Sequence, residues 1–176
     1  MKINIIAACD KDSIIGVNGK IPWRIPEDLK RFKEMTLGHA VICGRKTWNS
    51  LPFKPLPDRL NIIITGNKSY PITDNPLYAS SLNHALSNVS VRNYEQAFII
   101  GGEQLYREAL PLADCVYLTL VNQETPIADG DEVARFPLDE FNKMFDDNVF
   151  KCEDYDVYSE YRFMDCVRNA NTDISR

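Results

Sequence analysis

Short runs of apolar residues, many of them β-branched, recur along the first two thirds of the chain. They cover residues 3–9, 40–43, 60–65, 97–100 and 115–121. Runs that are apolar almost throughout are typical of strands covered on both faces. Segments with helix-like spacing lie between them, at residues 26–36, 47–51, 82–89 and 103–110. The alternation of strand and helix predicts an α/β fold with a mostly parallel sheet.

The pattern changes after residue 121. A polar stretch containing Gly, Pro and Asp runs to Phe136 and Pro137, and two further runs follow at residues 145–150 and 157–163. These two runs predict an antiparallel hairpin that closes one edge of the sheet. Because residues 168–176 are polar and without periodicity, we expect the end of the chain to fray. We therefore place one domain at residues 1–166 and a polar, flexible C-terminal tail at residues 167–176.

Composition indicates a soluble globular protein. The 176 residues fit one domain with a single core, and 44% of them are hydrophobic and 26% charged. A net charge of -5 offers no basic field for a phosphate backbone. No apolar run approaches the length of a signal or transmembrane segment. We expect a cytoplasmic protein with no nucleic-acid or membrane partner.

Five cysteines are present, at positions Cys9, Cys43, Cys115, Cys152 and Cys166. Their odd number, wide separation and lack of a Cys-x-x-Cys spacing argue against a disulfide framework or a zinc site. We expect all five to be reduced thiols.

Two adjacent acids, Glu27 and Asp28, follow Pro26 at the predicted start of a helix. Proline suits the first helical position, and acids in the first turn favour the positive helix end. At about 100° per residue, however, Asp28 falls within the arc formed by Leu29, Phe32, Met35 and Thr36. Glu27 falls about 100° away on the polar side, where an (i, i+4) pair with Arg31 is available.

The wheel therefore separates the two acids. Glu27 fits a solvated first-turn residue. A carboxylate on a core-facing arc costs several kcal/mol unless a partner compensates for it, so Asp28 is the candidate for a functional site. A ligand that offers hydrogen-bond donors would be its natural complement.

Glycine marks the ends of two predicted strands, at Gly44 and at Gly101-Gly102, each directly before a predicted helix. Either turn alone is common in α/β folds. Together they are more informative, because such sheets bind ligands at the carboxyl ends of their strands. Arg45 and Lys46 add cationic donors at one of these ends. Phosphate binding is the chemistry that this combination favours.

Other chemistries find little support. His39 and His84 are the only histidines, neither has metal-ligand spacing, and no Gly-x-Ser-x-Gly or P-loop motif occurs. Asp131 lies in a fragment that is similar to a calcium loop, but the remaining ligand spacing is missing. We expect no metal site and interpret Asp131 as a loop acid.

The sequence closely resembles the dihydrofolate reductases over residues 2–163. The matching blocks, in order, are Ile5-Ile6-Ala7-Ala8, Ile15-Gly16, Ile21-Pro22-Trp23, Glu27-Asp28-Leu29 with Phe32, Gly44-Arg45-Lys46-Thr47-Trp48, Leu56-Pro57-Asp58-Arg59, Ile100-Gly101-Gly102, Tyr106 and Leu118-Thr119. The resemblance implies a single domain with an eight-stranded, mostly parallel twisted sheet, an antiparallel C-terminal edge hairpin and about four helices. It also implies NADPH-dependent reduction of 7,8-dihydrofolate to tetrahydrofolate, which supports one-carbon and thymidylate metabolism.

The family pattern assigns substrate roles residue by residue. Asp28 would hold the pterin ring, helped by Thr119 and by the backbone of Ile6 and Ile100, with Ala8 beside it. Arg59 would bind the glutamate carboxylate. The aminobenzoyl slot would be lined by Leu29, Phe32, Leu51 and Leu56. We further hypothesise that the proton reaches nitrogen 5 through water admitted beside Ile21 and Trp23.

The pattern likewise assigns cofactor roles. Arg45 would lie near the NADPH 2′-phosphate, Thr65 and Gly66 near the adenosine half, and the Gly101-Gly102 bond is expected to be cis. The phosphates would meet Gly44, Lys46, Thr47, Gly101, Gly102, Glu103, Gln104 and Leu105. The nicotinamide and the lid over it, residues 10–23, would involve Ala8, Ile15, Gly16, Asn18, Lys20, Ile100 and Tyr106. Gly130-Asp131 resembles the acid that supports this lid.

Two alternatives remain beside the reductase. A pyrimidine reductase of riboflavin synthesis has a similar fold, but the set of Asp28, Phe32 and Arg59 disfavours it. A non-catalytic folate-binding or structural descendant of the reductase is the alternative from another class. The resemblance further implies a monomer that binds antifolates. Arg24, which adds a charge within the lid, fits no assigned role.

Overall fold

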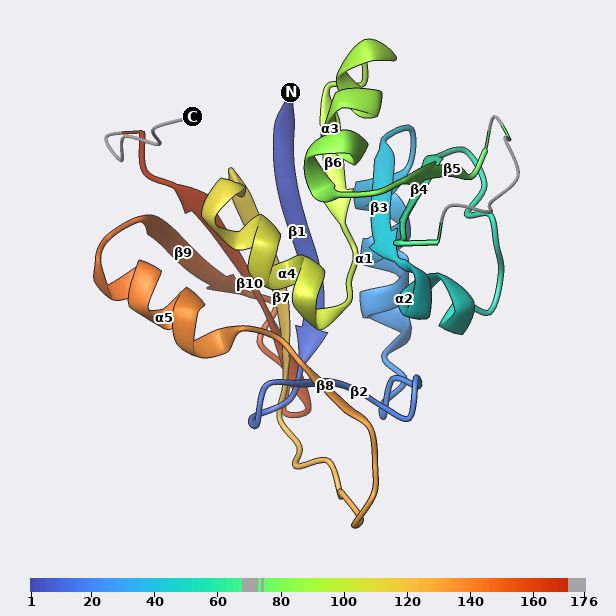
Figure 1. The fold of residues 1–176 in the computed structure, drawn as a ribbon. Helices are drawn as coiled ribbons and strands as arrows, with labels where there is room; N and C mark the ends of the chain where they lie inside the picture. The colour runs from blue at the N-terminus through green and yellow to red at the C-terminus, as the bar shows by residue number, and fades with distance from the viewer. Residues whose placement is uncertain (68–72, 74, 171–176) are drawn as a thin grey trace.

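The computed structural model describes residues 1–67, 73 and 75–170. Its main sheet has eight strands in the order β5-β4-β3-β6-β1-β7-β10-β9 (Figure 1). The strands are β1 (Lys2–Cys9), β3 (Ala40–Gly44), β4 (Leu60–Ile64), β5 (Leu77–Ala79), β6 (Gln96–Ile99), β7 (Cys115–Val121), β9 (Phe150–Tyr155) and β10 (Tyr161–Arg168). The first six strands of this spatial order, from β5 through β7, pair in parallel with their neighbours. Strand β10 pairs antiparallel with both β7 and β9. The predicted α/β class, the mostly parallel sheet and the antiparallel edge are confirmed.

Five α-helices accompany the sheet in the described part of the chain. They are α1 (Pro26–Thr36), α2 (Arg45–Ser50), α3 (Leu82–Val91), α4 (Glu103–Ala109) and α5 (Leu138–Asp146), with a short 3-10 helix η1 (Leu110–Leu112) after α4. In Figure 1, α4 and α5 lie in front of the sheet and α1 lies behind it. A separate two-stranded sheet joins β2 (Ile14–Val17) to β8 (Val133–Arg135).

Alternating side chains of the strands divide the interior between the two faces of the sheet. On β1, Ile5 joins the large core that also contains Leu105 of α4 and Phe141 of α5. Its neighbour Ile6 joins a smaller cluster that includes Phe32 of α1. Successive strand residues point to opposite faces, so one strand supplies both layers. The α1 face is the one that carries the candidate site.

The C-terminal region differs from its prediction. Residues 138–146 form α5, although residues 138–144 had no predicted element and residues 145–150 were predicted as a strand. Strand β9 begins only at Phe150, so the predicted strand is wrong in its bounds. The spacing of Leu138, Phe141 and Met144 is helical, and all three contribute to the large core. Strand β10 continues through Arg168, so the first two residues of the predicted tail belong to the sheet. Residues 171–176 lie outside the described residues.

The β9–β10 hairpin also corrects the expectation for two cysteines. Cys152 and Cys166 face each other in the register, with 4.0 Å between their Cα atoms, and form a disulfide. The strand register, which the spacing of cysteines does not reveal, brings them together. Cys9, Cys43 and Cys115 are free and buried. Burial raises the pKa of both Cys9 and Cys43 to about 12, so these two thiols stay protonated at neutral pH.

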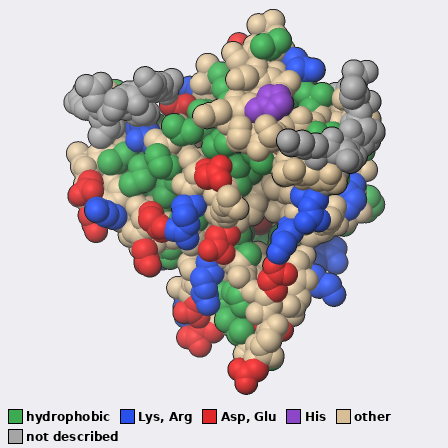
Figure 2. Space-filling view, viewed as in Figure 1, with side chains coloured by type: hydrophobic (Ala, Val, Ile, Leu, Met, Phe, Trp, Pro, Cys, Tyr) green, Lys and Arg blue, Asp and Glu red, His purple; other side chains and the backbone are tan. Residues whose placement is uncertain are grey.

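Acidic and basic side chains are interspersed on the face shown in Figure 2, where blue and red groups lie side by side over the lower half of the molecule. Ion pairs also join separate elements: Arg107 of α4 contacts Glu140 of α5, and Lys46 of α2 contacts Glu132 before β8. Within the described residues, every helix is too short or too polar to traverse a bilayer.

Candidate active site

Asp28 lies in the first turn of α1, which begins at Pro26 as predicted. Its carboxylate accepts a 2.5 Å hydrogen bond from the Oγ1 hydroxyl of Thr119 on β7. Burial raises the pKa of Asp28, while the Thr119 hydrogen bond and the charge of Arg31 act in the opposite direction. Glu27, in contrast, is exposed to solvent. The division of the two acids into a core-facing and a solvated one is confirmed.

Arg31 does not lie on the solvent-exposed face of α1, so the surface ion pair with Glu27 that the helical wheel suggested is wrong. Arg31 is 8% exposed and forms an ion pair with Asp165 of β10. On the wheel it falls about 60° from Asp28, between the polar and apolar arcs, so its position alone did not settle its side. Its partner is 134 residues away in sequence, a separation that no local pattern bridges.

The floor beneath Asp28 consists of the carboxyl ends of β1 and β7. Ala8 of β1 pairs with Thr119 of β7 in the parallel register. The hydroxyl of Tyr106 donates a 3.0 Å hydrogen bond to the carbonyl of Ile6. A carbonyl has two lone pairs, so Ile6 retains one for a ligand. Burial raises the pKa of Tyr106, which is a neutral donor at this floor.

An apolar wall adjoins the floor. Phe32, Leu56 and Ile100 pack against the cluster of Ile6, Val41 and Phe98. Leu29 is 54% exposed and Leu51, which follows α2, is half-buried. Four residues predicted for the aminobenzoyl slot thus come from α1, from the end of α2 and from the segment before β4, around one side of the sheet.

Arg59 is more deeply placed than a surface cation would be. It is 7% exposed, its Nε donates to the Pro57 carbonyl at 2.9 Å, and one terminal nitrogen donates to Thr36 Oγ1 at 3.0 Å. Its guanidinium carbon lies 5.9 Å from the Phe32 ring centroid. A guanidinium has five N–H donors, and these contacts use two of them. The remaining donors form a fixed fork of the kind that binds carboxylates.

The two glycine turns meet at the ends of β3 and β6. The Gly44 amide donates a 2.8 Å hydrogen bond to the Gly101 carbonyl, and the Gly101-Gly102 bond is cis, as predicted. A Cβ added at Gly101 would lie 3.2 Å from the Tyr106 hydroxyl, and one at Gly102 would lie 3.3 Å from Thr47 Oγ1. The φ of Gly101 is 117°, in the region that favours glycine. Glycine thus keeps this turn open for the close approach of a ligand.

Cations and polar groups surround this turn. Arg45 and Lys46 are exposed at the start of α2, and Lys46 forms an ion pair with Glu132. Glu103 accepts a 2.9 Å hydrogen bond from the Arg135 amide, and Gln104 is exposed. Leu105 belongs to the large core, so its side chain points away from the turn and only its backbone is suited to a ligand. Thr65 and Gly66 follow β4 at the same end of the sheet.

The predicted lid is attached to the loop before β8. The Asn18 side chain donates to Asp131 at 2.7 Å and accepts from the Glu132 amide at 2.9 Å. These hydrogen bonds are consistent with the predicted supporting role of Asp131, whose pKa the Ala128 and Asn18 donors lower. Ile15 packs against the large core, and Gly16 pairs with Ala134. Lys20 closes a turn through its backbone contacts with Val17.

The far end of the lid reaches α1. Ile21 is 62% exposed, whereas Trp23 packs against a cluster of Ile25, Val121, Tyr161 and Phe163. The structure therefore anchors Trp23 beside α1 and leaves Ile21 at the surface. Arg24, between them and the helix, is exposed.

Comparison with known proteins decides the family. The family model described as dihydrofolate reductase matches residues 2–168. The chain belongs to the dihydrofolate reductase family. A dihydrofolate reductase of Neisseria meningitidis is 46% identical over 122 residues, which cover 69% of this chain and 74% of the relative. That of Mycobacterium leprae is 40% identical over 134 residues, covering 75% of this chain and 79% of the relative.

The fold agrees with a solved member of the family. A dihydrofolate reductase from Enterococcus faecalis, in complex with NADP(H) and RAB-propyl, superposes with a TM-score of 0.77 at 27% sequence identity. The match covers 96% of each chain. The glycine turn, the floor and the wall described above therefore belong to a dihydrofolate reductase fold.

Proposed function

We propose that this protein is an NADPH-dependent dihydrofolate reductase that converts 7,8-dihydrofolate to 5,6,7,8-tetrahydrofolate. The observation that carries the proposal is the hydrogen-bonded pair of Asp28 and Thr119, located on the same side of the sheet as the wall of Phe32 and Leu56. This arrangement offers acceptors for a polar ring at one end and apolar contacts beyond it. Membership of the dihydrofolate reductase family supports the same substrate.

Asp28 is the proposed anchor for the pterin. Its carboxylate and the Thr119 hydroxyl are directed at one another from α1 and β7, which fixes the carboxylate orientation. The amino group and ring N–H of a pterin would donate to this carboxylate, assisted by the carbonyls of Ile6 and Ile100. A charge-assisted hydrogen bond of this type orients the ring as well as binding it. Leu29, Phe32, Leu51 and Leu56 would then flank the aminobenzoyl group.

Arg59 is the proposed receptor for the glutamate carboxylate. Its contacts with Pro57 and Thr36 hold the guanidinium in place before any ligand arrives. Pre-organisation of this type reduces the entropy that binding would otherwise cost.

The glycine turn is the proposed NADPH site, and the residues fit the group. Thr47, Gly101 and Gly102 form a cradle that a Cβ would fill, and Arg45 supplies a cation for the 2′-phosphate. Bound NADPH supplies the hydride for carbon 6 of the pterin. Ala8, Ile15, Gly16 and Tyr106 would border the nicotinamide, while Asn18 and Lys20 belong to the lid that excludes water from it.

The proton for nitrogen 5 requires water beside the pterin. We place its entry at the far end of the lid, where Ile21 is exposed and Trp23 is anchored. In this proposal Trp23 orders the entering water, and Ile21 opens or closes the path. Asp28 polarises the pterin rather than transferring the proton itself. The protein would act as a cytoplasmic monomer, and antifolates would compete for the same pterin anchor.

One assay tests this function. NADPH absorbance is followed after dihydrofolate is added, with and without an antifolate. We expect dihydrofolate-dependent loss of absorbance that the antifolate abolishes. Tight antifolate binding without turnover would support a non-catalytic folate-binding protein instead. If the protein shows neither turnover nor antifolate binding, both folate functions are refuted.

A further inference from the structure

Arg31 is a buried cation with an unusual set of neighbours. Its guanidinium carbon lies 4.7 Å from the ring centroid of Phe163 and 5.6 Å from that of Tyr117. The same guanidinium forms the ion pair with Asp165, whose side chain is 33% exposed. Two aromatic rings and one carboxylate, all from β7 and β10, therefore fix the position of a cation that belongs to α1.

Asp28 and Arg31 lie three residues apart on α1, so they are neighbours on its surface. The charge of Arg31 lowers the pKa of Asp28 against the larger opposing effect of burial. In a half-buried site such a charge is screened less than at the surface. The ion pair with Asp165 thus fixes a cation next to the anchor of the substrate.

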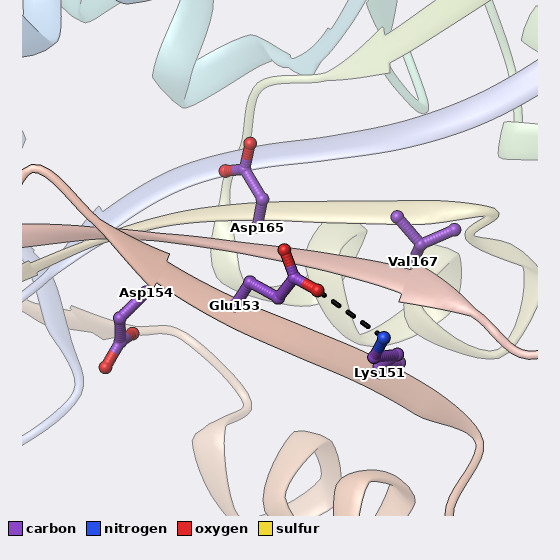
Figure 3. Close-up of a pocket in the computed structure, with 5 residues that line it drawn as sticks. All are labelled: Lys151, Glu153, Asp154, Asp165 and Val167. Atoms are coloured by element: carbon purple, nitrogen blue, oxygen red, sulfur yellow. Dashed lines mark ion pairs between the residues drawn. The ribbon is translucent and has the colours of Figure 1, made fainter.

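Other titratable groups face this region from each adjoining element. Tyr117 of β7 and Tyr106 of α4 are neutral, because burial raises the pKa of both phenols. On β9, Glu153 lies opposite Asp165 in the register and pairs with Lys151 at 3.5 Å. Figure 3 shows Asp165 and this pair along β9 and β10, with the Asp154 carboxylate directed away from Asp165. Arg31 is thus the buried cation within this set.

The stability of the fold does not by itself explain such a pair. Replacing a buried ion pair with apolar side chains of similar size is often neutral or stabilising. The cluster around Arg31, with Phe163 and Tyr117, would accommodate an apolar chain. Burial raises the pKa of Asp165 by more than the charge and hydrogen bond of Arg31 lower it, so the ion pair does not recover the whole cost of burying this carboxylate.

We propose that Arg31, held in place by Asp165, is a positioning residue that keeps a fixed positive charge beside the Asp28 carboxylate. The Arg31 guanidinium is paired with Asp165, and the Asp28 carboxylate bonds to Thr119, so its remaining acceptor positions are available for ligand donors. The consequence for turnover rests on the proposed function. The consequence for Asp28 itself does not, because it exists in the protein without any ligand.

The test is a ¹³C NMR titration of the aspartate carboxyl groups in the ligand-free protein, with the Asp28 signal assigned from the spectrum of Asp28→Asn. In Arg31→Met, which keeps a long side chain against Phe163, the Asp28 midpoint moves to higher pH because the cation is lost. In Asp165→Asn it moves to lower pH, because the whole charge of Arg31 then acts on Asp28. Arg31→Lys keeps the cation and moves the midpoint less than Arg31→Met does.

Asp154→Asn is the matched control. It removes a carboxylate from the same hairpin, where Asp154 pairs with Arg162 at 3.6 Å in an exposed position, and it leaves the Asp28 midpoint unchanged. Shifts in the same direction for Arg31→Met and Asp165→Asn, or no shift in any variant, would overturn the proposal. If Arg31→Met does not fold, the comparison of Arg31→Lys with Asp165→Asn decides in the same way.

Kinetics provide the second readout. The midpoint of the pH profile of kcat/KM for dihydrofolate follows the NMR midpoint in each variant. A one-unit rise of the midpoint in Arg31→Met lowers kcat/KM roughly tenfold at a pH below both midpoints, which equals about 1.4 kcal/mol. If the Asp28 midpoints shift as predicted in the NMR titration but the protein has no reductase activity, the proposed function is refuted and the positioning role of Arg31 stands.

Discussion

The two faces of the central sheet bury different kinds of side chain. The face under α3, α4 and α5 is filled by one apolar cluster, which includes Ile5, Leu118 and Phe150. The face under α1 combines a small apolar cluster with Asp28, Arg31 and Arg59, all partly or fully buried. Strand alternation places both faces on the same strands, so their difference arises from the side chains and not from the backbone.

The contrast separates stability from chemistry. An apolar cluster contributes free energy of folding in proportion to its buried area and is indifferent to pH. Buried charges cost free energy unless they are paired, and a fold that keeps them usually uses them for binding or catalysis. Substitutions on the first face should change stability at constant activity, and substitutions on the second should change activity at nearly constant stability.

Phe150→Ala gives the largest expected effect. Phe150 is 1% exposed and its ring lies 5.9 Å from that of Phe141. Loss of a buried aromatic ring costs about 3–5 kcal/mol of unfolding free energy. Urea denaturation measures this loss, while kcat per folded molecule stays unchanged. Phe145→Ala on the same helix-and-strand unit is the control, because Phe145 is 49% exposed and its loss should cost about 0.5 kcal/mol or less.

Arg59→Lys should raise KM for dihydrofolate roughly 10- to 100-fold, the range that a charged hydrogen bond of about 1.5–3 kcal/mol represents. Lysine keeps the charge but lacks the two-pronged geometry. The matched measurement uses a pterin substrate without the glutamate, for which KM should not change. An equal rise in KM for both substrates would mean that Arg59 supports the structure of the site and does not bind the glutamate carboxylate.

Arg45→Gln should raise KM for NADPH roughly tenfold, because one charge-assisted contact with the 2′-phosphate is lost. KM for NADH, which lacks that phosphate, should stay the same. Lys46→Gln provides a comparison with a smaller effect, about a few-fold, since Lys46 is exposed and already paired with Glu132. If Lys46→Gln, and not Arg45→Gln, weakened the preference for NADPH over NADH, the 2′-phosphate contact would belong to Lys46.

Asp28→Asn should stabilise the protein slightly. Burial raises the pKa of Asp28 above its unfolded value, so the ionised carboxylate penalises the folded state as pH rises. Relative to wild type, the variant therefore gains stability above about pH 4, where unfolded aspartate ionises, and the gain levels off above the raised folded pKa. The gain at neutral pH should be on the order of 1 kcal/mol. Thermal unfolding of both proteins at pH 4 and pH 8 measures this gain. If the stability difference between Asp28→Asn and wild type became smaller as pH rises, the predicted direction of the effect would be wrong.

Local patterns predicted the elements that form the site. Helix α1 and strand β7 have the predicted bounds, because Pro26 marks a helix start and residues 115–121 form an uninterrupted apolar run. The wheel also separated Asp28 from Glu27. Both inferences need only short-range periodicity, which the sequence displays directly.

Long-range pairing was beyond those patterns. The Arg31–Asp165 ion pair and the Cys152–Cys166 disulfide depend on the register of β9 and β10. Strands β2 and β8 were missed because each has four residues or fewer, and α5 was missed because its apolar positions followed a polar loop. The burial of Arg59 likewise depends on Thr36, which lies 23 residues earlier.

The most direct test of the central claim compares wild type with Asp28→Asn in one reductase assay at neutral pH, with NADPH and dihydrofolate. If the α1 face anchors the pterin through Asp28, the variant stays folded and loses roughly 100-fold or more of kcat/KM. A folded Asp28→Asn protein that retains wild-type kcat/KM for dihydrofolate would contradict the account.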